Sequence, residues 1–474
     1  MNFYRDCAGV LTRLAEKKGS VQSLISTLPE KDRRRGAALI IETLKYHPVL
    51  LEIIQTSGIL QHEKKILKDS NLVLLLVHDL LLSKGGIQAA DGPIKQAVLK
   101  HKTRLSAELV KVKVKRGVTK VEDLAVSTAG SSGNGRRWVR LNTLKSSQED
   151  ILRALEKEGF TYVDGEHDLS GKAFILDRHI PNLVAIAPSV RIQESTLFNE
   201  GKLIIQDKAS CFPAFVLDPP SNPNTHVIDA TAAPGNKTSH LSALMQGRGR
   251  ITAFERDRKR FQTLKTMLER AGASNVMPKN QDFLSVDPND VEYANVTHIL
   301  LDPSCSGSGI VNRLDHLVQT ENEGDSETDK RLEKLASFQL TMIRHAMKFP
   351  SLRRLVYSTC SIHAKENEEV VIQALECDEA IQGGFLLEDR SKVIPAWPRR
   401  GMLPEGIATA FDPGSVIRCS PEDGTNGFFV SCFIRDGTAS APSKRKAEAM
   451  SEGSEDEGPK EPVAAKKKRK KRKV

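Results

Sequence analysis

The sequence predicts an α/β protein in which an all-helical region precedes a Rossmann-like, mostly parallel sheet. From Leu203 onwards, apolar runs of strand length alternate with helical segments, as in a parallel sheet with helical crossovers. Before about residue 125, apolar residues instead recur at three- and four-residue spacing, as in residues 37–44 and 72–82, which indicates helices. The strands that we expect in the sheet are residues 225–228, 250–254, 297–301, 352–357 and 428–434.

Changes of composition divide the chain further. Residues 126–135 include the run Ser-Thr-Ala-Gly-Ser-Ser-Gly-Asn-Gly, which is typical of a flexible linker. The acidic segment 310–334 interrupts the alternation of strands and helices, so we expect a surface loop there. The predicted parts are a helical region (1–125), the linker (126–135), a small α/β unit (136–200), the sheet-based core (201–436) and a disordered, lysine-rich tail (437–474).

The composition and the residue spacing predict a globular protein that has no membrane-spanning helix, no disulfide bonds and no structural metal site. Apolar residues make up 39% of the chain, and the longest apolar run, residues 72–82, is far short of the ~20 residues that a membrane-spanning helix needs. The first residues lack the charged-then-apolar layout of a secretory signal. The 7 cysteines are scattered, with no Cys-x-x-Cys pair and no histidine cluster at metal-binding spacing. We therefore expect neither disulfides nor structural zinc.

Much of the net charge of +10 lies in the last part of the chain. Residues 437–474 hold 12 Lys and Arg against 6 Asp and Glu, a balance of +6. The basic runs 443–446 and 466–473 predict a nuclear or nucleolar protein; a solubilising or RNA-binding tail is the alternative. Basic residues also interleave the segment 95–116, where either a solvated helix face or contact with nucleic acid would explain them.

Acidic residues follow successive predicted strands at positions where a nucleoside would bind. Asp229 ends the first strand and leads into Ala-Thr-Ala-Ala-Pro-Gly, whose small residues let a ligand approach the backbone closely. Glu255 follows the next strand, where a carboxylate can accept hydrogen bonds from ribose hydroxyls, and Asp282 and Asp302 come later. Since the Gly-x-Gly-x-x-Gly pattern is absent, a cofactor with adenosine and no phosphates, S-adenosylmethionine, fits best. Each acid taken singly could instead cap a helix.

Two cysteines stand on tight turns directly after predicted strands. Cys305 lies in Asp-Pro-Ser-Cys-Ser-Gly-Ser-Gly, and Cys360 lies in Ser-Thr-Cys-Ser. Thiols beside a nucleoside-like cofactor suggest covalent activation of a base, because carbon 5 of cytosine is too poor a nucleophile to attack a methyl sulfonium directly. Thiolate addition at carbon 6 makes the ring enamine-like and reactive at carbon 5. An acid beside the thiol and a pocket for an unstacked base complete such a site.

Three ordered motifs carry a resemblance to a known family: Asp-Ala-Thr-Ala-Ala-Pro-Gly-Asn-Lys-Thr from Asp229, Asp-Pro-Ser-Cys-Ser-Gly-Ser-Gly from Asp302, and Tyr-Ser-Thr-Cys-Ser-Ile from Tyr357. With Arg-Leu-Asn-Thr-Leu and Gln-Asp-Lys-Ala-Ser upstream, residues 137–435 resemble the Sun-domain family of RNA (cytosine-5) methyltransferases. The resemblance implies a class I methyltransferase core with a seven-stranded sheet, S-adenosylmethionine as cofactor, no metal, and RNA as partner. We also expect the small unit to recognise RNA and the protein to act as a monomer.

The resemblance also implies roles for individual residues. Cys360 matches the nucleophile that attacks carbon 6, and Cys305 matches the second cysteine, which helps to release the methylated product. Asp302 matches an acid that contacts both cofactor and cytosine, and Lys208 matches a basic residue that lines the active site. The residues that match cofactor-binding positions are Ala232, Ala233, Pro234, Gly235, Asn236, Lys237, Thr238, Glu255, Arg260, Asp282 and Asp302.

Two departures from the family pattern bear on activity and substrate. Thr231 stands where the family usually has cysteine, and because the two are similar in size we expect no loss of activity. Pro-Ser-Cys at residues 303–305 replaces the usual Ala-Pro-Cys, and it resembles the family member that modifies large-subunit ribosomal RNA, free or in a pre-ribosomal particle. A transfer RNA substrate is one alternative. A ribosome-assembly scaffold without catalysis is another, although Asp302, Cys305 and Cys360 are all present.

Overall fold

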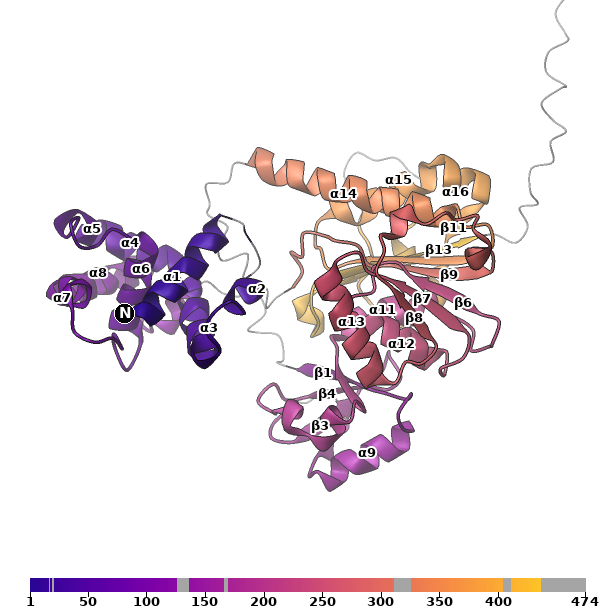
Figure 1. Cartoon of the computed structure of the whole chain (residues 1–474), viewed down its shortest axis with the longest axis horizontal. Helices are drawn as coiled ribbons and strands as arrows, with labels where there is room; N and C mark the ends of the chain where they lie inside the picture. The colour runs from indigo at the N-terminus through magenta and orange to yellow at the C-terminus, as the bar shows by residue number, and fades with distance from the viewer. Residues whose placement is uncertain are drawn as a thin grey trace, which may run out of the picture. The chain divides into compact units, whose positions relative to one another are not determined.

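The computed structural model describes residues 1–16, 18, 21–125, 136–165, 169–310, 325–403 and 411–435. The predicted linker and the predicted tail lie outside these residues, as do residues 311–324 of the predicted acidic loop. Figure 1 shows the helical region, a smaller sheet that contains β1 and a larger sheet that contains β6.

The chain before residue 125 is helical, as predicted, and packs around one buried helix. In α6 (Ser70–Leu82) every residue from 72 to 79 is buried, and this helix contacts α1, α3, α4, α7 and α8. A helix that is apolar all round must be enclosed by other helices. In the described residues, no helix combines the length and the apolar character needed to cross a bilayer. The helices of this region are α1 (Asn2–Ala15), α2 (Val21–Ile25), α3 (Glu30–Lys45), α4 (His47–Ser57), α5 (Ile59–His62), α6, α7 (Pro93–Lys100) and α8 (Lys102–Lys115).

A small five-stranded sheet follows, with the order β2-β3-β4-β1-β5. Strand β1 lies between β4 and β5 and is antiparallel to both, and α9 (Gln148–Lys157) buries Ile151 and Leu155 in the core of this unit. Because β5 belongs to this sheet, the small unit extends past residue 200, where the sequence analysis ends it. A three-residue strand carries no pattern that tells which sheet it joins. The strands are β1 (Arg137–Leu141), β2 (Thr161–Tyr162), β3 (Ala173–Leu176), β4 (Leu183–Ile186) and β5 (Leu203–Ile205).

The core contains the predicted mostly parallel sheet. Its order is β11-β13-β10-β9-β6-β7-β8, and β12 pairs with β13 as an additional, eighth strand. Neighbours from β8 to β10 are parallel, whereas β11, β12 and β13 pair antiparallel. All five predicted strands are confirmed as β6 (His226–Asp229), β7 (Arg250–Phe254), β9 (Val296–Leu301), β10 (Arg354–Thr359) and β13 (Phe428–Arg435); the others are β8 (Val276–Lys279), β11 (Phe385–Leu387) and β12 (Ile417–Cys419).

Helices cover both faces of the core sheet (Figure 1). Apolar side chains of α11 (Lys208–Leu217), α12 (Asn236–Leu244) and α13 (Arg258–Ala271) form one buried cluster with one face of the strands. Those of α14 (Asp325–Met347) and α15 (Glu368–Glu376), together with Ala380 of α16 (Asp378–Gly383), form a second cluster with the other face. This double cover explains why almost every residue of the central strands β6, β7, β9 and β10 is buried.

The prediction of a loop over residues 310–334 is wrong for its last ten residues, because α14 begins at Asp325. Leu332 is buried, and Ala336, Met342 and Ile343 belong to or pack against the same apolar cluster. These residues recur at the spacing of one helix face. Charged residues dominate the start of the helix and hide that spacing in the sequence.

A buried arginine attaches the small sheet to the core. Arg140 of β1 is 1% exposed. Its guanidinium donates hydrogen bonds to Gln206 Oε1 at 2.8 Å, Ser239 Oγ at 2.8 Å and the carbonyl oxygen of Asn236 at 3.3 Å. Burial lowers the pKa of Arg140 to about 10, so the group stays charged at neutral pH. The small sheet therefore holds the first turn of α12 through a charge-assisted contact.

Replacing Asn142 by alanine should destabilise the junction between the small sheet and the core. The fully buried Asn142 Nδ2 donates to the carbonyl oxygens of Gly201 and Ala271, both at 2.8 Å. Without it two buried carbonyl groups lose a partner, and we expect the free energy of unfolding to fall by about 2–4 kcal/mol.

Tryptophan fluorescence during urea unfolding measures this loss where it occurs. The chain has 2 tryptophans, and both Trp138 and Trp397 are buried in the part that contains the two sheets. The exposed Asn199 provides the matched control, because Asn199→Ala should change the unfolding free energy by less than about 0.5 kcal/mol. Equal effects of the two substitutions would contradict the role given to Asn142.

Candidate active site

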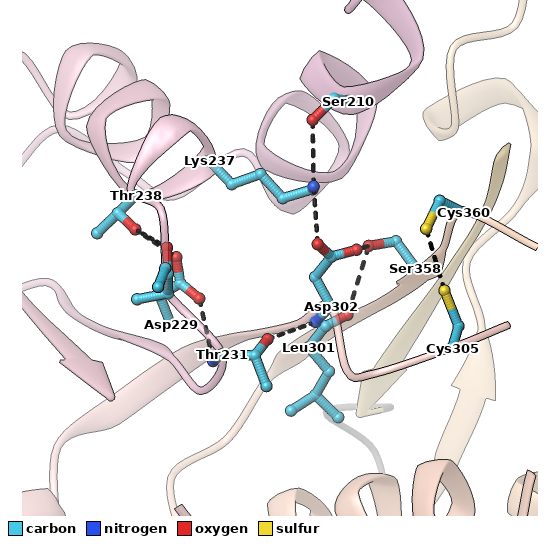
Figure 2. A network of polar contacts seen from close by, with 12 residues as sticks. Ser210, Asp229, Thr231, Lys237, Thr238, Leu301, Asp302, Cys305, Ser358 and Cys360 are labelled. Atoms are coloured by element: carbon cyan, nitrogen blue, oxygen red, sulfur yellow. Dashed lines mark hydrogen bonds and ion pairs between the residues drawn. The ribbon is translucent and has the colours of Figure 1, made fainter. Parts of the chain in front are cut away.

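The carboxyl ends of four neighbouring strands bring the predicted site residues to one edge of the core sheet. β6 ends at Asp229, Glu255 follows β7, Asp302 follows β9 and Cys360 follows β10. The order β10-β9-β6-β7 is parallel throughout, so these ends lie side by side. Figure 2 shows one end of this edge, where Asp229, Asp302 and both predicted cysteines lie close together.

Cys305 and Cys360 point toward each other across the site (Figure 2). Their Sγ atoms lie 3.1 Å apart, neither forms a disulfide, and both residues are half-buried. The hydrogen bond to Cys360, together with burial, raises the pKa of Cys305 well above the usual value of a thiol. Cys305 therefore stays protonated at neutral pH, and its S–H group can donate to the sulfur of Cys360.

The carboxylate of Asp302 lies between a cation and a hydroxyl group. Its Oδ2 accepts a hydrogen bond from Lys237 Nζ at 2.8 Å, and its Oδ1 accepts one from Ser358 Oγ at 2.8 Å. Its backbone N–H donates to Thr231 Oγ1 at 2.9 Å. Thr231, which stands where the family usually has cysteine, thus fixes the start of the Asp302 turn through its hydroxyl group.

Lys237 belongs to the predicted cofactor segment, but the structure places its ammonium group beside the acid that the sequence analysis assigns to catalysis. Nζ bonds Asp302 and also donates to Ser210 Oγ at 3.1 Å, and it lies 5.2 Å from the centre of the Phe428 ring. Burial alone would lower the pKa of Lys237, but the Asp302 carboxylate and the neighbouring Cys360 thiol raise it, and the net shift is upward. A permanent positive charge therefore lies between the cofactor segment and the thiols.

The cofactor segment is shaped by a buried carboxylate and by one glycine. Asp229 accepts hydrogen bonds from Thr238 Oγ1 at 2.7 Å and from the backbone N–H of Thr231 at 3.3 Å, which closes the turn between β6 and α12. Gly235 has φ +111°, and a Cβ atom there would lie 3.2 Å from Leu264 Cδ1. Glycine alone adopts this positive φ and leaves room for Leu264, so α12 can begin directly after the turn. The first backbone N–H groups of α12 have no acceptor within the helix.

Glu255 and Arg260 form the next part of the site. Arg260 Nη1 lies 3.3 Å from Glu255 Oε2, and Arg260 Nη2 donates to the carbonyl oxygen of Ala233 at 2.7 Å. Glu255 Oε1 accepts from the backbone N–H of Asp257 at 2.8 Å. Arg260 of α13 therefore joins Glu255, which follows β7, to the Ala-Pro-Gly turn.

Asp282 caps a short turn, which is the alternative that the sequence left open. Its Oδ1 accepts from the backbone N–H of Leu284 at 3.0 Å, and its Oδ2 lies 3.6 Å from Arg256 Nη1. The side chain is still 41% exposed, so a carboxylate oxygen remains accessible to a ligand.

This donor set fits a cofactor that contains adenosine and no phosphate groups. The Glu255 carboxylate suits two ribose hydroxyls, the accessible Asp282 suits an adenine amino group, and the N–H groups at the start of α12 suit a terminal carboxylate. S-adenosylmethionine has these three features. Among the described residues, no group of His, Cys, Asp and Glu side chains has the arrangement of a metal site.

Lys208 lies in a buried aromatic cage. It forms an ion pair with Asp177 and a hydrogen bond of 2.9 Å with His179 Nδ1, and its Nζ lies 5.1 Å and 5.2 Å from the ring centres of Trp138 and Trp397. It also lines a cavity of about 1050 Å³ whose lining includes neither Cys305 nor Cys360. Within the described residues, Lys208 therefore contacts side chains of both the small unit and the core. Its role in the active site remains a prediction.

Three consecutive polar residues that the sequence analysis missed are fully buried behind the thiols: Glu366, Asn367 and Glu368. Both carboxylate oxygens of Glu368 accept from Arg418, each at 2.6 Å. The run Lys-Glu-Asn-Glu-Glu looks like the solvated start of a helix, because acids are common in a first helical turn. Nothing in one sequence separates a buried run of this kind from an exposed one.

The affinity for S-adenosylhomocysteine should fall as the pH is lowered through about 6. Burial raises the pKa of Asp229 to about 6, so this carboxyl is ionised above that pH and protonated below it. Only the ionised form accepts strongly from both Thr231 and Thr238, and these bonds shape the cofactor turn.

Calorimetric titration with S-adenosylhomocysteine between pH 7.5 and about pH 5 measures this effect. Asp229→Asn carries no titrating group there, so it should bind weakly and with little change over the same range. A wild-type affinity that stays constant from pH 7.5 to about pH 5 would show that Asp229 does not control the turn.

Family models match almost the whole described chain. A model described as 16S rRNA methyltransferase RsmB/F matches residues 214–433. Two models of NOL1/NOP2/Sun domain family member 5 match upstream: its N-terminal domain matches residues 35–125, and its ferredoxin-like domain matches residues 135–206.

Whole proteins give the same result. A 25S rRNA (cytosine-C(5))-methyltransferase of Schizosaccharomyces pombe is 47% identical over 432 residues, which is 91% of each chain. A 28S rRNA (cytosine-C(5))-methyltransferase of Mus musculus is 40% identical over 454 residues, 93% of each chain. The crystal structure of PH0851 shares the fold, with a TM-score of 0.58 at 20% identity over 91% of this chain and 99% of that one. The chain therefore belongs to the NOL1/NOP2/Sun domain family of RNA (cytosine-5) methyltransferases.

Proposed function

We propose that this enzyme methylates carbon 5 of a cytosine in large-subunit ribosomal RNA through a covalent bond between Cys360 and carbon 6. The observation that carries the mechanism is the pair of thiols 3.1 Å apart beside the Lys237–Asp302 ion pair. The choice of RNA is supported by the two relatives named for 25S and 28S rRNA, which match over more than nine-tenths of their length.

Addition of the thiol is the first step. The Cys360 thiolate forms a bond from sulfur to carbon 6, and the π electrons of the carbon 5–carbon 6 bond move toward carbon 5. A proton taken up from water and shared between Asp302 and ring nitrogen 3 offsets the charge that develops on the ring, and it is released again with the product. Lys237 holds this carboxyl group in place and adds positive charge near the sulfur. S-adenosylmethionine, when bound, supplies the methyl group that carbon 5 accepts.

Release of the product restores the double bond between carbon 5 and carbon 6. The proton on carbon 5 passes to water, the electrons of that C–H bond restore the carbon 5–carbon 6 double bond, and the bond from carbon 6 to the Cys360 sulfur breaks. The departing Cys360 sulfur keeps the electron pair of that bond and takes a proton from Cys305, whose S–H group lies next to it. Cys305 then regains a proton from water, and Cys360 loses one to water before the next addition. The raised pKa of Cys305 suits this role, because the proton is still present at neutral pH when the Cys360 sulfur needs it.

We also propose that the enzyme acts as a monomer in the nucleus or nucleolus, during ribosome biogenesis. The basic runs 443–446 and 466–473 support this location. The small sheet remains our candidate for RNA recognition.

The substitution Cys360→Ala should abolish methylation and leave binding of S-adenosylhomocysteine nearly normal. The thiol is needed for addition to carbon 6, whereas the cofactor turn lies on other strands. The measurement is site-resolved mapping of 5-methylcytosine on total RNA from cells that lack the protein and re-express wild type or Cys360→Ala.

One lost site in large-subunit rRNA, restored by wild type alone, would establish substrate and nucleophile together. Loss of a 5-methylcytosine site in transfer RNA would show that transfer RNA is the substrate and would leave the proposed mechanism unchanged. No change at any site would contradict the proposed activity.

The substitution Cys305→Ala should make a covalent complex between enzyme and RNA accumulate. Without the proton held on Cys305, the bond from the Cys360 sulfur to carbon 6 breaks slowly. The complex is seen as a band of raised mass on a denaturing gel. Cys305→Ala combined with Cys360→Ala is the control and should show no band. Rapid turnover of Cys305→Ala without a trapped complex would remove Cys305 from the release step.

A further inference from the structure

Two adjacent buried residues, Glu366 and Asn367, hold the turns of both cysteines from behind. Glu366 ends a short 3-10 turn, and Asn367 precedes α15. Both side chains are fully buried. Glu366 and Asn367 are here called the brace.

Glu366 holds the Cys305 turn on both sides of the cysteine. Its Oε1 accepts from the backbone N–H of Ser306 at 2.9 Å and from Gln339 Nε2 at 2.9 Å. Gln339 Nε2 also donates to the carbonyl oxygen of Ser304 at 3.1 Å. The hydroxyl group of Tyr357, buried in β10, lies 2.5 Å from the carbonyl oxygen of Glu366 and 3.0 Å from Gln339 Oε1, so it contacts both residues. The residues before and after Cys305 are thus tied to one carboxylate.

Asn367 does the same for the Cys360 turn. Its Oδ1 accepts from Thr359 Oγ1 at 2.6 Å, and its Nδ2 donates to the carbonyl oxygen of Ser361 at 2.9 Å. One amide therefore holds the residues on either side of Cys360. Because Asn367 follows Glu366 directly, the two turns are fixed to points one peptide bond apart.

We propose that Glu366 and Asn367 are positioning residues that set the distance and orientation between the two thiols. Glu366, with Gln339, controls Cys305, and Asn367 controls Cys360. This inference rests on the two-thiol mechanism proposed above. It concerns the release step most directly, since a proton moves between sulfurs only when they are in hydrogen-bond contact.

The burial of Glu366 supports a positioning role over a purely structural one. Its Oε2 is buried without a hydrogen-bond partner among the described residues. Burying a carboxylate with one oxygen unpaired is costly, and only the contacts of its other oxygen offset that cost. What the carboxylate provides and an apolar side chain does not is an acceptor that reaches Ser306 N–H and Gln339 at once.

The test follows each step of the reaction in matched variants. The full-length protein is mixed with S-adenosylmethionine and a transcript that contains the mapped large-subunit rRNA site. Methyl transfer in the first turnover, steady-state turnover and the covalent band are measured together. Cys305→Ala is the positive control for the band.

Glu366→Leu should behave like Cys305→Ala. We expect steady-state turnover to fall by about tenfold or more, because displacement of a catalytic group by about 1 Å costs up to ~10²-fold. First-turnover methyl transfer should stay within about threefold of wild type, and the covalent band should accumulate. Glu366→Gln keeps an acceptor at Oε1, so it should restore most of the turnover. Equal loss in both steps without a band would overturn the assignment of Glu366.

Asn367→Leu should give the opposite pattern. The Cys360 turn loses its support, so first-turnover methyl transfer should fall by about tenfold or more, and no band should accumulate. Normal first-turnover transfer in this variant would overturn the assignment of Asn367.

Two further variants keep the test decisive if Glu366→Leu does not fold. Gln339→Met has nearly the same volume and removes the donor to Ser304 and Glu366, so it should give the same band at lower yield. Glu388→Gln is the matched control: it changes a largely buried carboxylate that pairs with Arg354 at the other end of β10, and it should leave all three measurements unchanged. Binding of S-adenosylhomocysteine by each variant confirms that the core is folded.

The experiment distinguishes an error in the positioning role of the brace from an error in the two-thiol mechanism. If Cys305→Ala gives no covalent band, the two-thiol mechanism is wrong, and the positioning role of Glu366 and Asn367 is overturned as well. If Cys305→Ala gives the band while Glu366→Leu and Gln339→Met do not, the mechanism stands and the brace is overturned.

Discussion

The ion pair between Lys237 and Asp302 is the contact on which the geometry of the site depends. It joins the first helix after β6 to the turn after β9, and therefore joins the cofactor segment to the thiols. Both side chains are largely buried, with exposures of 14% and 28%. Removing one member of a buried pair costs about 3–5 kcal/mol, because the remaining charge is left without compensation. The pair therefore cannot be lost without disturbing both halves of the site.

The parallel sheet makes this pairing possible. Carboxyl ends of β6, β9 and β10 lie next to each other, so residues far apart in sequence meet within one layer of turns. The hydroxyl groups of Thr231 and Ser358 then fix the Asp302 turn from two sides. Asp302 and Cys360 each stand directly after a buried strand.

The sequence predicts the parts of this site that repeat a local pattern. Apolar runs followed by acids or cysteines identified the strands and placed Asp229, Asp302, Cys305 and Cys360 at their ends. The family resemblance supplied the roles of the thiols, which remain predictions. The eight-stranded composition of the sheet was less accessible, because short edge strands such as β12 carry too few residues for a pattern.

Contacts between distant segments account for what the sequence analysis missed. Lys237 was assigned to the cofactor segment as a whole, and only the fold shows that its side chain turns toward Asp302. Glu366 and Asn367 have the composition of an exposed helix start, and their burial depends on α14 and β10 packing over them. The helical start of α14 was hidden for a related reason, since its charged residues obscure the spacing of its apolar face.

The small sheet is not a detachable module, although a family model covers it separately as residues 135–206. Arg140 reaches from β1 into the first turn of α12, and Asn142 reaches the last residue of α13, Ala271. These two helices carry Lys237 and Arg260. A core transplanted without its small sheet would keep the sequence motifs and lose the supports of the helices that present them. A substitution on the outward surface of this sheet therefore leaves these supports intact, whereas a substitution of its inward residues also changes the core.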